Sequence, residues 1–304
     1  MFDVVVLTDS RFINPEKSNP LIANAILEDQ LVIDALNNIG LRTIKKAWDD
    51  PNFDWKLTKY ALFRSTWDCF NRFETFTAWF QQTKNVTRFI NSHKLVSWNM
   101  DKHYLKDLEQ NGINIPKTLY IEPGSQFNLK QAMDKARLQL GFESENLVLK
   151  PCIAGGARHT YMFHKDDWEK YDAVFQELTA VETMMLQEFQ KNIVEEGEIS
   201  IVLFNGKYAH AILKNAKPGD FRVQDDFGGS IQKYQPSKAE IEFATQVLHA
   251  SPELPIYARV DIFRDNGGNL ALAELEIFEP ELWFRRYPEA AKVLATSIKE
   301  KLFN

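Results

Sequence analysis

The sequence predicts a mixed α/β and α+β chain, and three observations support this class. The length of 304 residues allows two or three domains with their own cores, and 44% hydrophobic with 26% charged residues is ordinary for a globular protein. Apolar strands alternate with helices near the N-terminus, and the last third is rich in short strands. We place three domains at residues 1–97, 98–186 and 187–304.

The first domain is predicted from a βαβ-like alternation. An apolar strand at 3–7 is followed by an irregular stretch and a helix that Gly40 ends. That helix has an apolar stripe at intervals of four, at Leu27, Leu31, Ala35 and Ile39. Strands at 42–48 and 60–63 and an aromatic helix around Phe76 complete the domain. No G-x-G-x-x-G motif follows the first strand, so a dinucleotide-binding domain is not expected.

The second and third domains are predicted from capping signals and short apolar runs. Asn99-Met100-Asp101 precedes a helix at 102–110, which opens the second domain. A strand at 147–150, a strand at 160–164 and a helix at 166–179 follow. The third domain is read as strands at 185–189, 198–204, 208–214, 257–263 and 270–278.

The last two strands form a predicted hairpin around the Asn-Gly-Gly-Asn turn at 266–269. A turn centred on its two glycines places Asp261 opposite Glu274 and Arg259 opposite Glu276. All four side chains then share one face, because strand side chains alternate with period two.

Opposed like charges on such a hairpin need compensation. Directly paired positions have Cβ atoms about 4.5–5.5 Å apart, and two carboxylates at that separation repel. A hard divalent cation such as Mg²⁺ binds carboxylate oxygens and supplies the missing charge. We therefore predict a metal site at Asp261, Glu274 and Glu276, with a solvated outer hairpin face as the alternative.

Further candidate residues are weak signals when taken alone. Lys150 ends an apolar strand just before a small-residue loop, in which Gly155 and Gly156 let backbone N–H groups approach phosphate. Four more positions could either bind a ligand or be ordinary surface or strand-end residues. They are Lys102, Glu188, Phe189 and Glu198.

The order of these motifs along the chain is more specific, because it resembles the ATP-grasp superfamily. The ordered motifs are Asp-Lys at 101–102, Leu-Lys-Pro at 149–151, Gln-Glu-Phe at 187–189, Gly-Glu-x-Ser at 197–200, Lys214, Gly-Asp-Phe-Arg at 219–222, Gly228-Gly229, Arg-Val-Asp at 259–261 and Glu-x-Glu at 274–276. The pattern is most similar to the glutathione-synthetase and RimK-like branch, near the cyclo-ligases of D-cycloserine biosynthesis. Arg-Ser-Thr-Trp-Asp at 64–68 is similar to a segment of that cyclo-ligase group. The resemblance implies an ATP-grasp fold, with a Rossmann-like N-terminal domain before two α+β ATP-grasp subdomains.

The resemblance also implies roles in binding ATP and metal. Lys102 and Lys150, beside the Gly155-Gly156 loop, would contact the phosphates. Glu188 and the Phe189 backbone would bind the adenine edge, and Glu198 would bind the ribose. Asp261, Glu274 and Glu276 would hold Mg²⁺, or Mn²⁺ in its place. Glu276 stands where the family commonly has a neutral asparagine, so metal binding and an ion pair with Arg259 both remain open.

The implied reaction activates a carboxylate. A substrate carboxylate takes the γ-phosphoryl group of ATP, and an amine or similar nucleophile then displaces phosphate. Arg259 would stabilise the oxyanion and Lys214 the developing charge, while Arg222 with the Gly228-Gly229 loop would exclude water. The substrate itself is expected to contact Arg64, Ser65, Trp67 and Asp68.

Two other functions fit the same fold: a small-molecule kinase, in which an alcohol accepts the phosphoryl group, and a non-catalytic ATP-binding regulator. An oxyanion arginine argues against the regulator. The net charge of −6 opposes nucleic-acid binding, and no membrane segment or signal sequence is evident. Cys69 and Cys152 form neither a disulfide framework nor a zinc pattern, which favours a reducing cytoplasm. Oligomeric state, a homo-oligomer included, is left open.

Overall fold

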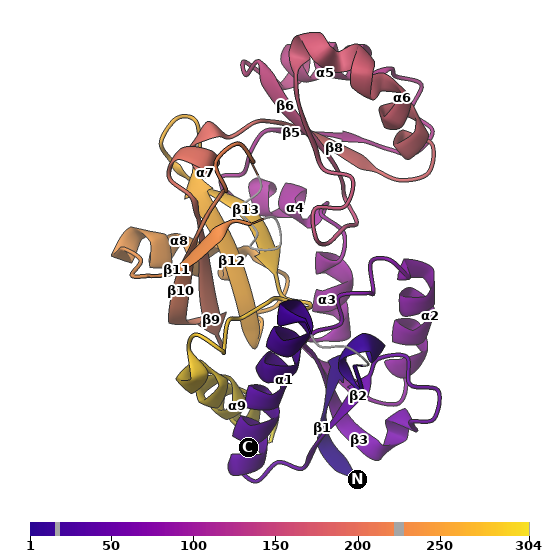
Figure 1. The fold of residues 1–304 in the computed structure, drawn as a ribbon, viewed down its shortest axis with the longest axis vertical. Helices are drawn as coiled ribbons and strands as arrows, with labels where there is room; N and C mark the ends of the chain where they lie inside the picture. Colours follow the sequence, from indigo (N-terminus) through magenta and orange to yellow (C-terminus); the bar gives the residue numbers. More distant parts are fainter. Residues whose placement is uncertain (16–18, 222–227, 304) are drawn as a thin grey trace.

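Three sheets follow one another along the long axis of the molecule (Figure 1). The structure is a computed structural model that describes residues 1–15, 19–221 and 228–303. In the described residues, no helix is both long enough and apolar enough to cross a membrane.

The first sheet is parallel, with strand order β2-β1-β3-β4. Its elements are β1 (Phe2–Thr8), η1 (Ser10–Phe12), α1 (Pro20–Asn38), β2 (Thr43–Ala47), η2 (Trp55–Leu57), β3 (Thr58–Phe63), α2 (Phe73–Thr83) and β4 (Arg88–Ile90). The apolar run of β1 is buried on both faces, as a central parallel strand requires. Helix α1 begins where Asn19 caps the Ile22 N–H and Pro20 occupies the first turn.

The buried face of α1 contains Ala35, with Leu31 and Ile39 packed against the same core, as predicted. Leu27 is the exception at 46% exposed, whereas Val32 and Leu36 are fully buried. Glu28 and Asp29 also face inward. Glu28 accepts hydrogen bonds from two backbone N–H groups near the C-terminus, and Asp29 accepts one from a buried serine.

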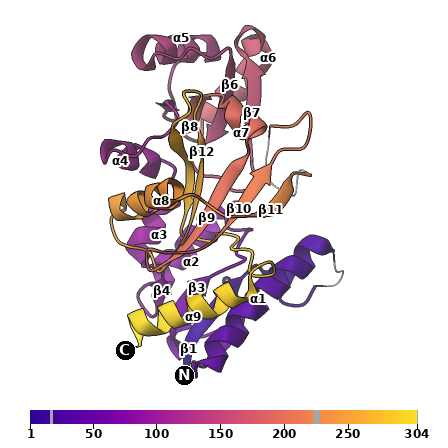
Figure 2. The ribbon, with the colours of Figure 1, turned by 90° about the vertical axis from the view of Figure 1, so that its left-hand side faces the viewer.

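The second sheet is antiparallel, with order β5-β8-β6-β7 and two helices on one face (Figure 2). Its elements are β5 (Thr118–Ile121), α5 (Leu129–Leu140), β6 (Asn146–Pro151), β7 (Tyr161–His164), η3 (Lys165–Asp167), α6 (Trp168–Thr179) and β8 (Met184–Glu188). The sequence reading missed β5 and α5. A local signal for α5 was present, since Asn128 and Gln131 form a capping box and Gly141 ends the helix in a left-handed conformation.

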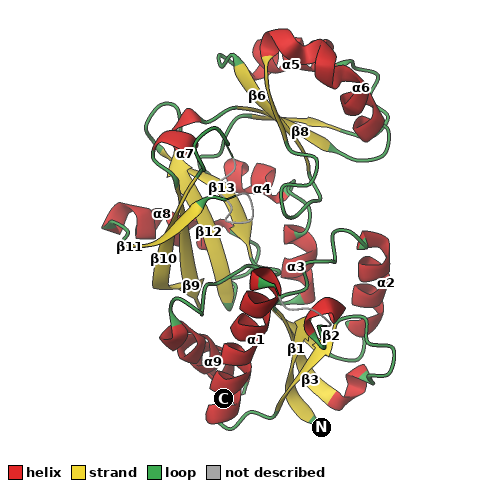
Figure 3. Cartoon of the chain, viewed as in Figure 1, coloured by secondary structure: helices red, strands yellow, loops and turns green. Residues whose placement is uncertain are grey.

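The third sheet is antiparallel, with order β11-β10-β9-β12-β13 (Figure 3). Its strands are β9 (Glu198–Phe204), β10 (Lys207–Asn215), β11 (Ser230–Tyr234), β12 (Tyr257–Arg264) and β13 (Leu270–Glu276). The helices around it are α3 (His93–Asn99), α4 (Tyr104–Gln110), α7 (Lys191–Glu195), α8 (Lys238–Ala250) and α9 (Pro288–Leu302). The predicted helix at 102–110 starts later, at Tyr104, because Asn99 still belongs to α3.

The hairpin of β12 and β13 has the predicted pairs but a different turn. Asp261 pairs with Glu274 and Arg259 with Glu276, whereas Ile262 pairs with Leu272. The register therefore shifts by one residue between Asp261 and Ile262, through a β-bulge. The turn is longer than predicted, and the bulge restores the alignment of the charged residues.

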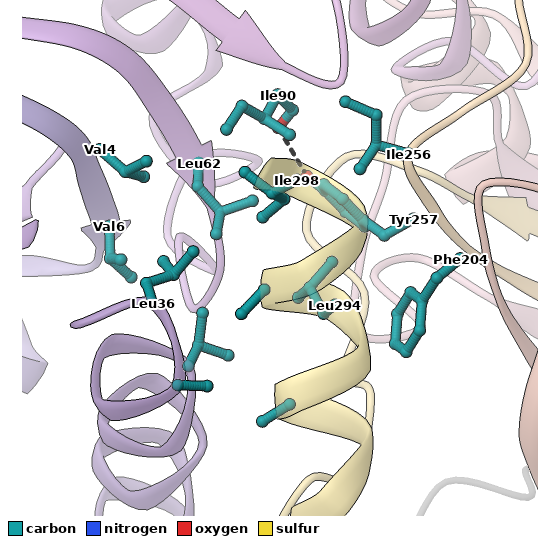
Figure 4. Close-up of a cluster of buried hydrophobic side chains, with 14 of the residues drawn as sticks. Val4, Val6, Leu36, Leu62, Ile90, Phe204, Ile256, Tyr257, Leu294 and Ile298 are labelled. Atoms are coloured by element: carbon teal, nitrogen blue, oxygen red, sulfur yellow. Dashed lines mark hydrogen bonds between the residues drawn. The ribbon is translucent and has the colours of Figure 1, made fainter. Parts of the chain in front are cut away.

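The C-terminal helix α9 packs against α1 and against β9 and β10 of the third sheet. Leu294 and Ile298 share one core with Val4 and Leu62, and Phe204 at the end of β9 joins them (Figure 4). The first and last parts of the chain thus form one hydrophobic unit. The domain boundaries at 97 and 186 stay a prediction.

Candidate active site

The charged residues of the hairpin face one another in a buried ion-pair network. Arg259 contacts Asp261 through Nη2 at 2.8 Å and also pairs with the Glu276 carboxylate. Its guanidinium lies 5.2 Å from the Trp283 ring centroid. In this structure Glu276 pairs with Arg259, which is one of the two roles that the sequence left open for it.

Asp261 is the most heavily paired acid of this network. Oδ1 accepts from Ser200 Oγ at 2.6 Å, and Oδ2 lies 3.2 Å from Lys214 Nζ. Burial alone would raise the pKa of Asp261, but the neighbouring Arg259 and Lys214 outweigh it and lower that pKa to about 2. Asp261 is therefore ionised at neutral pH.

Glu276 is in the opposite electrostatic situation. Burial, together with the charges of Glu274 and Asp261, raises the pKa of Glu276 to about 7 in spite of Arg259. The raised pKa means that Glu276 gives up its negative charge more readily than Asp261 does.

The predicted metal ligands are not gathered at one point. Among the described residues, the one group of three potential ligands whose donor atoms lie within 4.8 Å of one another is elsewhere. Cations from the chain itself provide the compensation that the sequence argument assigned to a metal: Lys102 pairs with Glu274 at 3.0 Å, and Arg259 separates Asp261 from Glu276. The hard carboxylate oxygens fit Mg²⁺, which would replace part of this pairing.

Two lysines lie over the hairpin. Lys150 comes from the second sheet, and Lys102 comes from the turn before α4. Lys102 Nζ donates to the Ala154 carbonyl at 2.8 Å and pairs with Glu274. Lys150, at the end of β6, has no hydrogen-bond or ion-pair partner in the part of the chain that the structure describes. Burial lowers the pKa of Lys150, and Lys102 adds to that effect while Glu274 opposes it. An unpartnered, half-buried lysine is a suitable position for an anion.

The Gly155-Gly156 loop packs against the N-terminal domain. A Cβ on Gly155 would lie 2.7 Å from the Phe70 ring, so only glycine fits there without movement. Gly156 has a φ of +59°, with open space where its Cβ would be. The loop therefore lies close to both Lys102, through Ala154, and the first domain.

Glu198 and Lys214 form a second buried ion pair at the same face. Burial lowers the pKa of Lys214, but the carboxylates of Asp261 and Glu198 outweigh it and raise that pKa. The Glu198 carboxylate, predicted to bind ribose, is thus paired with the lysine predicted to stabilise charge.

The predicted adenine contacts already have partners. The Phe189 N–H donates to the Asn146 carbonyl at 3.0 Å, and the Phe189 carbonyl accepts from Asn266 at 3.0 Å. The Glu188 carboxylate accepts from the Ser144 N–H at 2.9 Å. An adenine contact to these groups stays a prediction, and it requires sharing or exchange of these hydrogen bonds.

The segment 64–68 lies beside the hairpin, but two of its predicted substrate contacts are engaged within the first domain. Ser65 Oγ donates to Asp29 at 2.7 Å, and Asp68 accepts from the Trp48 ring N–H at 2.8 Å. These contacts give Ser65 and Asp68 structural partners, and their contact with substrate stays a prediction.

The other two residues of the segment reach the chain that follows β13. Arg64 donates to the Pro280 carbonyl at 3.2 Å, and Trp67 donates to the Glu279 carbonyl at 3.3 Å. The segment therefore holds the loop that leaves the acidic hairpin.

Glu279 is the site residue that sequence reasoning missed. In the described chain its carboxylate has no hydrogen-bond or ion-pair partner. Burial, with Glu276 and Glu274 nearby, raises the pKa of Glu279 well above its ordinary value, and Arg259 opposes this. The acidic run Glu274-x-Glu276-x-x-Glu279 was visible in the sequence, but only the fold shows that its third member turns toward the other two.

The remaining predicted residues lie at the edge of the described chain. Arg222 falls outside the described residues. Gly228 has a φ of +82° and would place a Cβ 3.3 Å from Lys217, and Gly229 directly precedes β11. Their predicted role in covering the site stays a prediction.

Comparison with known proteins agrees with this geometry. Residues 4–91 match the family model of the N-terminal domain of the D-cycloserine synthetase DcsG, and residues 131–266 match the ATP-grasp domain of prokaryotic glutathione synthetase. The chain is 28% identical over 285 residues to the cycloserine biosynthesis protein DcsG of Streptomyces lavendulae, which covers 89% of this chain and 92% of that protein.

Solved structures show the same fold. The crystal structure of D-cycloserine synthetase DcsG superposes with a TM-score of 0.85 and 25% identity, over 98% of this chain and 99% of the other. A D-alanine–D-alanine ligase from Bacillus anthracis, complexed with ATP, superposes with a TM-score of 0.60 and 16% identity, over 99% and 97% of the two chains.

The fold, the order of the motifs and these matches define the class of protein: the chain belongs to the ATP-grasp superfamily and is an ATP-dependent ligase that forms C–N bonds. Within that superfamily it is similar to the D-cycloserine synthetase DcsG, both in residues 4–91 and over the full length of the chain.

Proposed function

We propose that this ligase activates the carboxylate of a small amino-acid-like substrate as an acyl phosphate and transfers the acyl group to an amine or similar nucleophile. The observation that carries the proposal is Lys150. It is half-buried and lacks a partner in the described chain, yet it faces a network in which Lys102, Lys214 and Arg259 are paired. A transferred phosphoryl group supplies the anion that this lysine lacks.

The ATP contacts follow from the same geometry. Lys150 and Lys102 hold phosphate oxygens, and the loop around Gly155 brings backbone N–H groups close to them. Asp261 and Glu274 would hold Mg²⁺, which supplies charge neutralisation at the phosphates when bound. Lys102 can turn from Glu274 to phosphate, because both partners carry the charge that it needs.

Activation and transfer depend on Arg259 and Lys214. The Arg259 guanidinium is fixed by two carboxylates and by Trp283, so its orientation is set before substrate binds. A donor fixed in this way stabilises the oxyanion of the tetrahedral intermediate without reorganising. Lys214, next to Asp261, neutralises developing charge.

The substrate's ammonium group is assigned to Glu279. This carboxylate is half-buried and lacks a cationic partner in the described chain, which is unfavourable until a cation binds. Trp67 fixes its backbone, and Arg64 fixes the next residue. The similarity to a D-cycloserine synthetase makes small amino-acid derivatives the first substrates to test.

The test is a screen of amino acids with ATP, Mg²⁺ and hydroxylamine. An acyl phosphate is trapped as a hydroxamate with release of ADP and inorganic phosphate. A kinase would leave the phosphoryl group on its substrate, and release neither phosphate nor hydroxamate. Phosphorylated product without hydroxamate would overturn the ligase mechanism and favour the kinase.

The ammonium assignment has its own test. Glu279→Gln should raise the KM of the amino-acid substrate at least tenfold and leave the KM of ATP within twofold. The same carboxylic acid without its amino group should be used equally well by the parent and Glu279→Gln. An unchanged KM for the amino acid would contradict the role of Glu279.

A further inference from the structure

A cluster of a carboxylate, an imidazole and a thiol lies beside the phosphate lysines and outside the proposed reaction. The ligand atoms of Asp101, His103 and Cys152 all lie within 4.8 Å of one another. Asp101 and His103 come from the turn between α3 and α4, and Cys152 follows β6. Cys152 is 1% exposed, and the other two are half-buried.

The imidazole is held in one orientation by partners on both nitrogens. Nδ1 lies 2.6 Å from Asp101 Oδ1, and Nε2 lies 3.1 Å from Glu122 Oε1. Thr183 donates to the other Glu122 oxygen at 2.8 Å, and the His103 ring stacks on Tyr120 with centroids 4.8 Å apart. The Nδ1 atom thus faces Asp101, a member of the cluster, and the Nε2 atom faces Glu122 outside it.

We propose that Asp101, His103 and Cys152 bind a thiophilic divalent cation of the Zn²⁺ type. Thiolate, imidazole and carboxylate are the donors that Zn²⁺ takes, at about 2.0–2.3 Å, whereas Mg²⁺ selects oxygen alone. Glu122 then has the position of the carboxylate that orients a metal-bound histidine from behind. On binding, Cys152 releases its proton to solvent and the metal–sulfur bond replaces the S–H bond.

The site joins the two segments that carry the phosphate lysines. The Lys102 N–H donates to the Cys152 carbonyl at 3.0 Å, and the Cys152 N–H donates to the Thr183 carbonyl at 2.9 Å. A cation bound by both Asp101 and Cys152 adds a further link between the same segments, next to these two backbone hydrogen bonds. It therefore fixes the backbone of Lys102 and Lys150 relative to each other, independently of which substrate the ligase uses.

The experiment is a Co²⁺ titration of the full-length protein, followed by displacement with Zn²⁺. A thiolate ligand gives a sulfur-to-cobalt charge-transfer band in the near ultraviolet, which carboxylates do not produce. We expect one equivalent of Co²⁺ to produce the band, Zn²⁺ to remove it, and one equivalent of Zn²⁺ to raise the melting temperature.

Four variants assign the band. Cys152→Ser should abolish it, whereas Cys69→Ser, the matched change at the other buried cysteine, should leave it unchanged. Glu274→Gln should also keep it, which separates this site from the hairpin carboxylates. Glu122→Gln, at a largely exposed side chain that is not a ligand, should weaken Co²⁺ affinity about 10- to 100-fold.

Two results would overturn the proposal. One is a folded parent protein without a charge-transfer band at excess Co²⁺, and the other is a band that persists in Cys152→Ser. Either would leave the cluster as a histidine hydrogen-bonded between two carboxylates.

Discussion

The hairpin of β12 and β13 and the segment 64–68 lie side by side and carry polar residues that the sequence predicts to bind ligands, but their polar groups have different partners. In the segment, Ser65 and Asp68 are bonded to neighbours in their own domain. On the hairpin, Glu274 is paired with Lys102 from outside the third sheet, and Asp261 is paired with Lys214 of β10 and with Arg259 of its own strand, beside an unpartnered Lys150.

The partners of a polar group indicate whether it is available to bind a ligand or is used within the protein structure. A side chain whose hydrogen bonds are satisfied within its own domain gains little by contacting a ligand, because it must first lose those bonds. A carboxylate that is paired with a lysine of another segment can exchange that lysine for a bound cation, which carries charge of the same sign. Ligand binding is therefore expected where charge is shared between segments.

The largest expected effect is on turnover at Arg259. Arg259→Ala should lower the rate of hydroxamate formation about 100- to 1000-fold, as expected for the loss of one oxyanion donor. Lys150→Ala should mainly weaken ATP binding, measured by calorimetry. Arg259→Lys, which keeps the charge beside Asp261 and Glu276, controls for folding. Near-parental turnover in Arg259→Ala would mean that the hairpin is no more involved in the reaction than the segment 64–68.

The second effect is on stability at Asp261. The sequence argument, based on repulsion, expects Asp261→Asn to fold as well as the parent or better. The structure predicts the reverse, because Asp261 is paired with Arg259 and Lys214. Its lowered pKa, about 2 against an ordinary 3.8, corresponds to about 2 kcal/mol of unfolding free energy at pH 7.

The sign of the pH dependence provides the check. A carboxyl with a depressed pKa stabilises the fold above its unfolded pKa of 3.8, and this contribution is lost as pH falls through 2. The difference between parent and Asp261→Asn in urea unfolding should therefore be largest at neutral pH and shrink below pH 4. A difference that grows on acidification would contradict the ion-pair assignment.

The third effect is on stability without an effect on binding. Asp68→Ala leaves the buried Trp48 ring N–H without its acceptor, which should lower the unfolding free energy by about 1–3 kcal/mol. The KM of each substrate should stay within twofold well below the melting temperature. A tenfold rise in substrate KM in a folded Asp68→Ala protein would instead restore the predicted substrate contact.

The smallest effect is at the contact between the small-residue loop and the first domain. Gly155→Ala places a methyl group 2.7 Å from the Phe70 ring, and the displaced loop should raise the KM of ATP several-fold. Phe70→Ala combined with Gly155→Ala should restore it, since the space is then open. Failure of the double variant to recover would mean that the loop is displaced for another reason.

Local sequence patterns determined the features that depend on neighbours in the chain. The alternation along 257–263 and 270–278 was enough to place Asp261 opposite Glu274, and the motif order was enough to identify the superfamily. Register and face follow from period two and a nearby turn. The predicted turn was nevertheless one residue wrong, because a β-bulge has no signature in the alternation itself.

Tertiary structure alone decided which partners the charged residues have. Lys102 meets Glu274 from a position 172 residues away in the chain, and α9 packs against α1 and shares one core with the first and third sheets. Asp101, His103 and Cys152 come together without any ligand spacing in the sequence. Such contacts depend on how whole sheets pack, so periodicity along the chain carries no information about them.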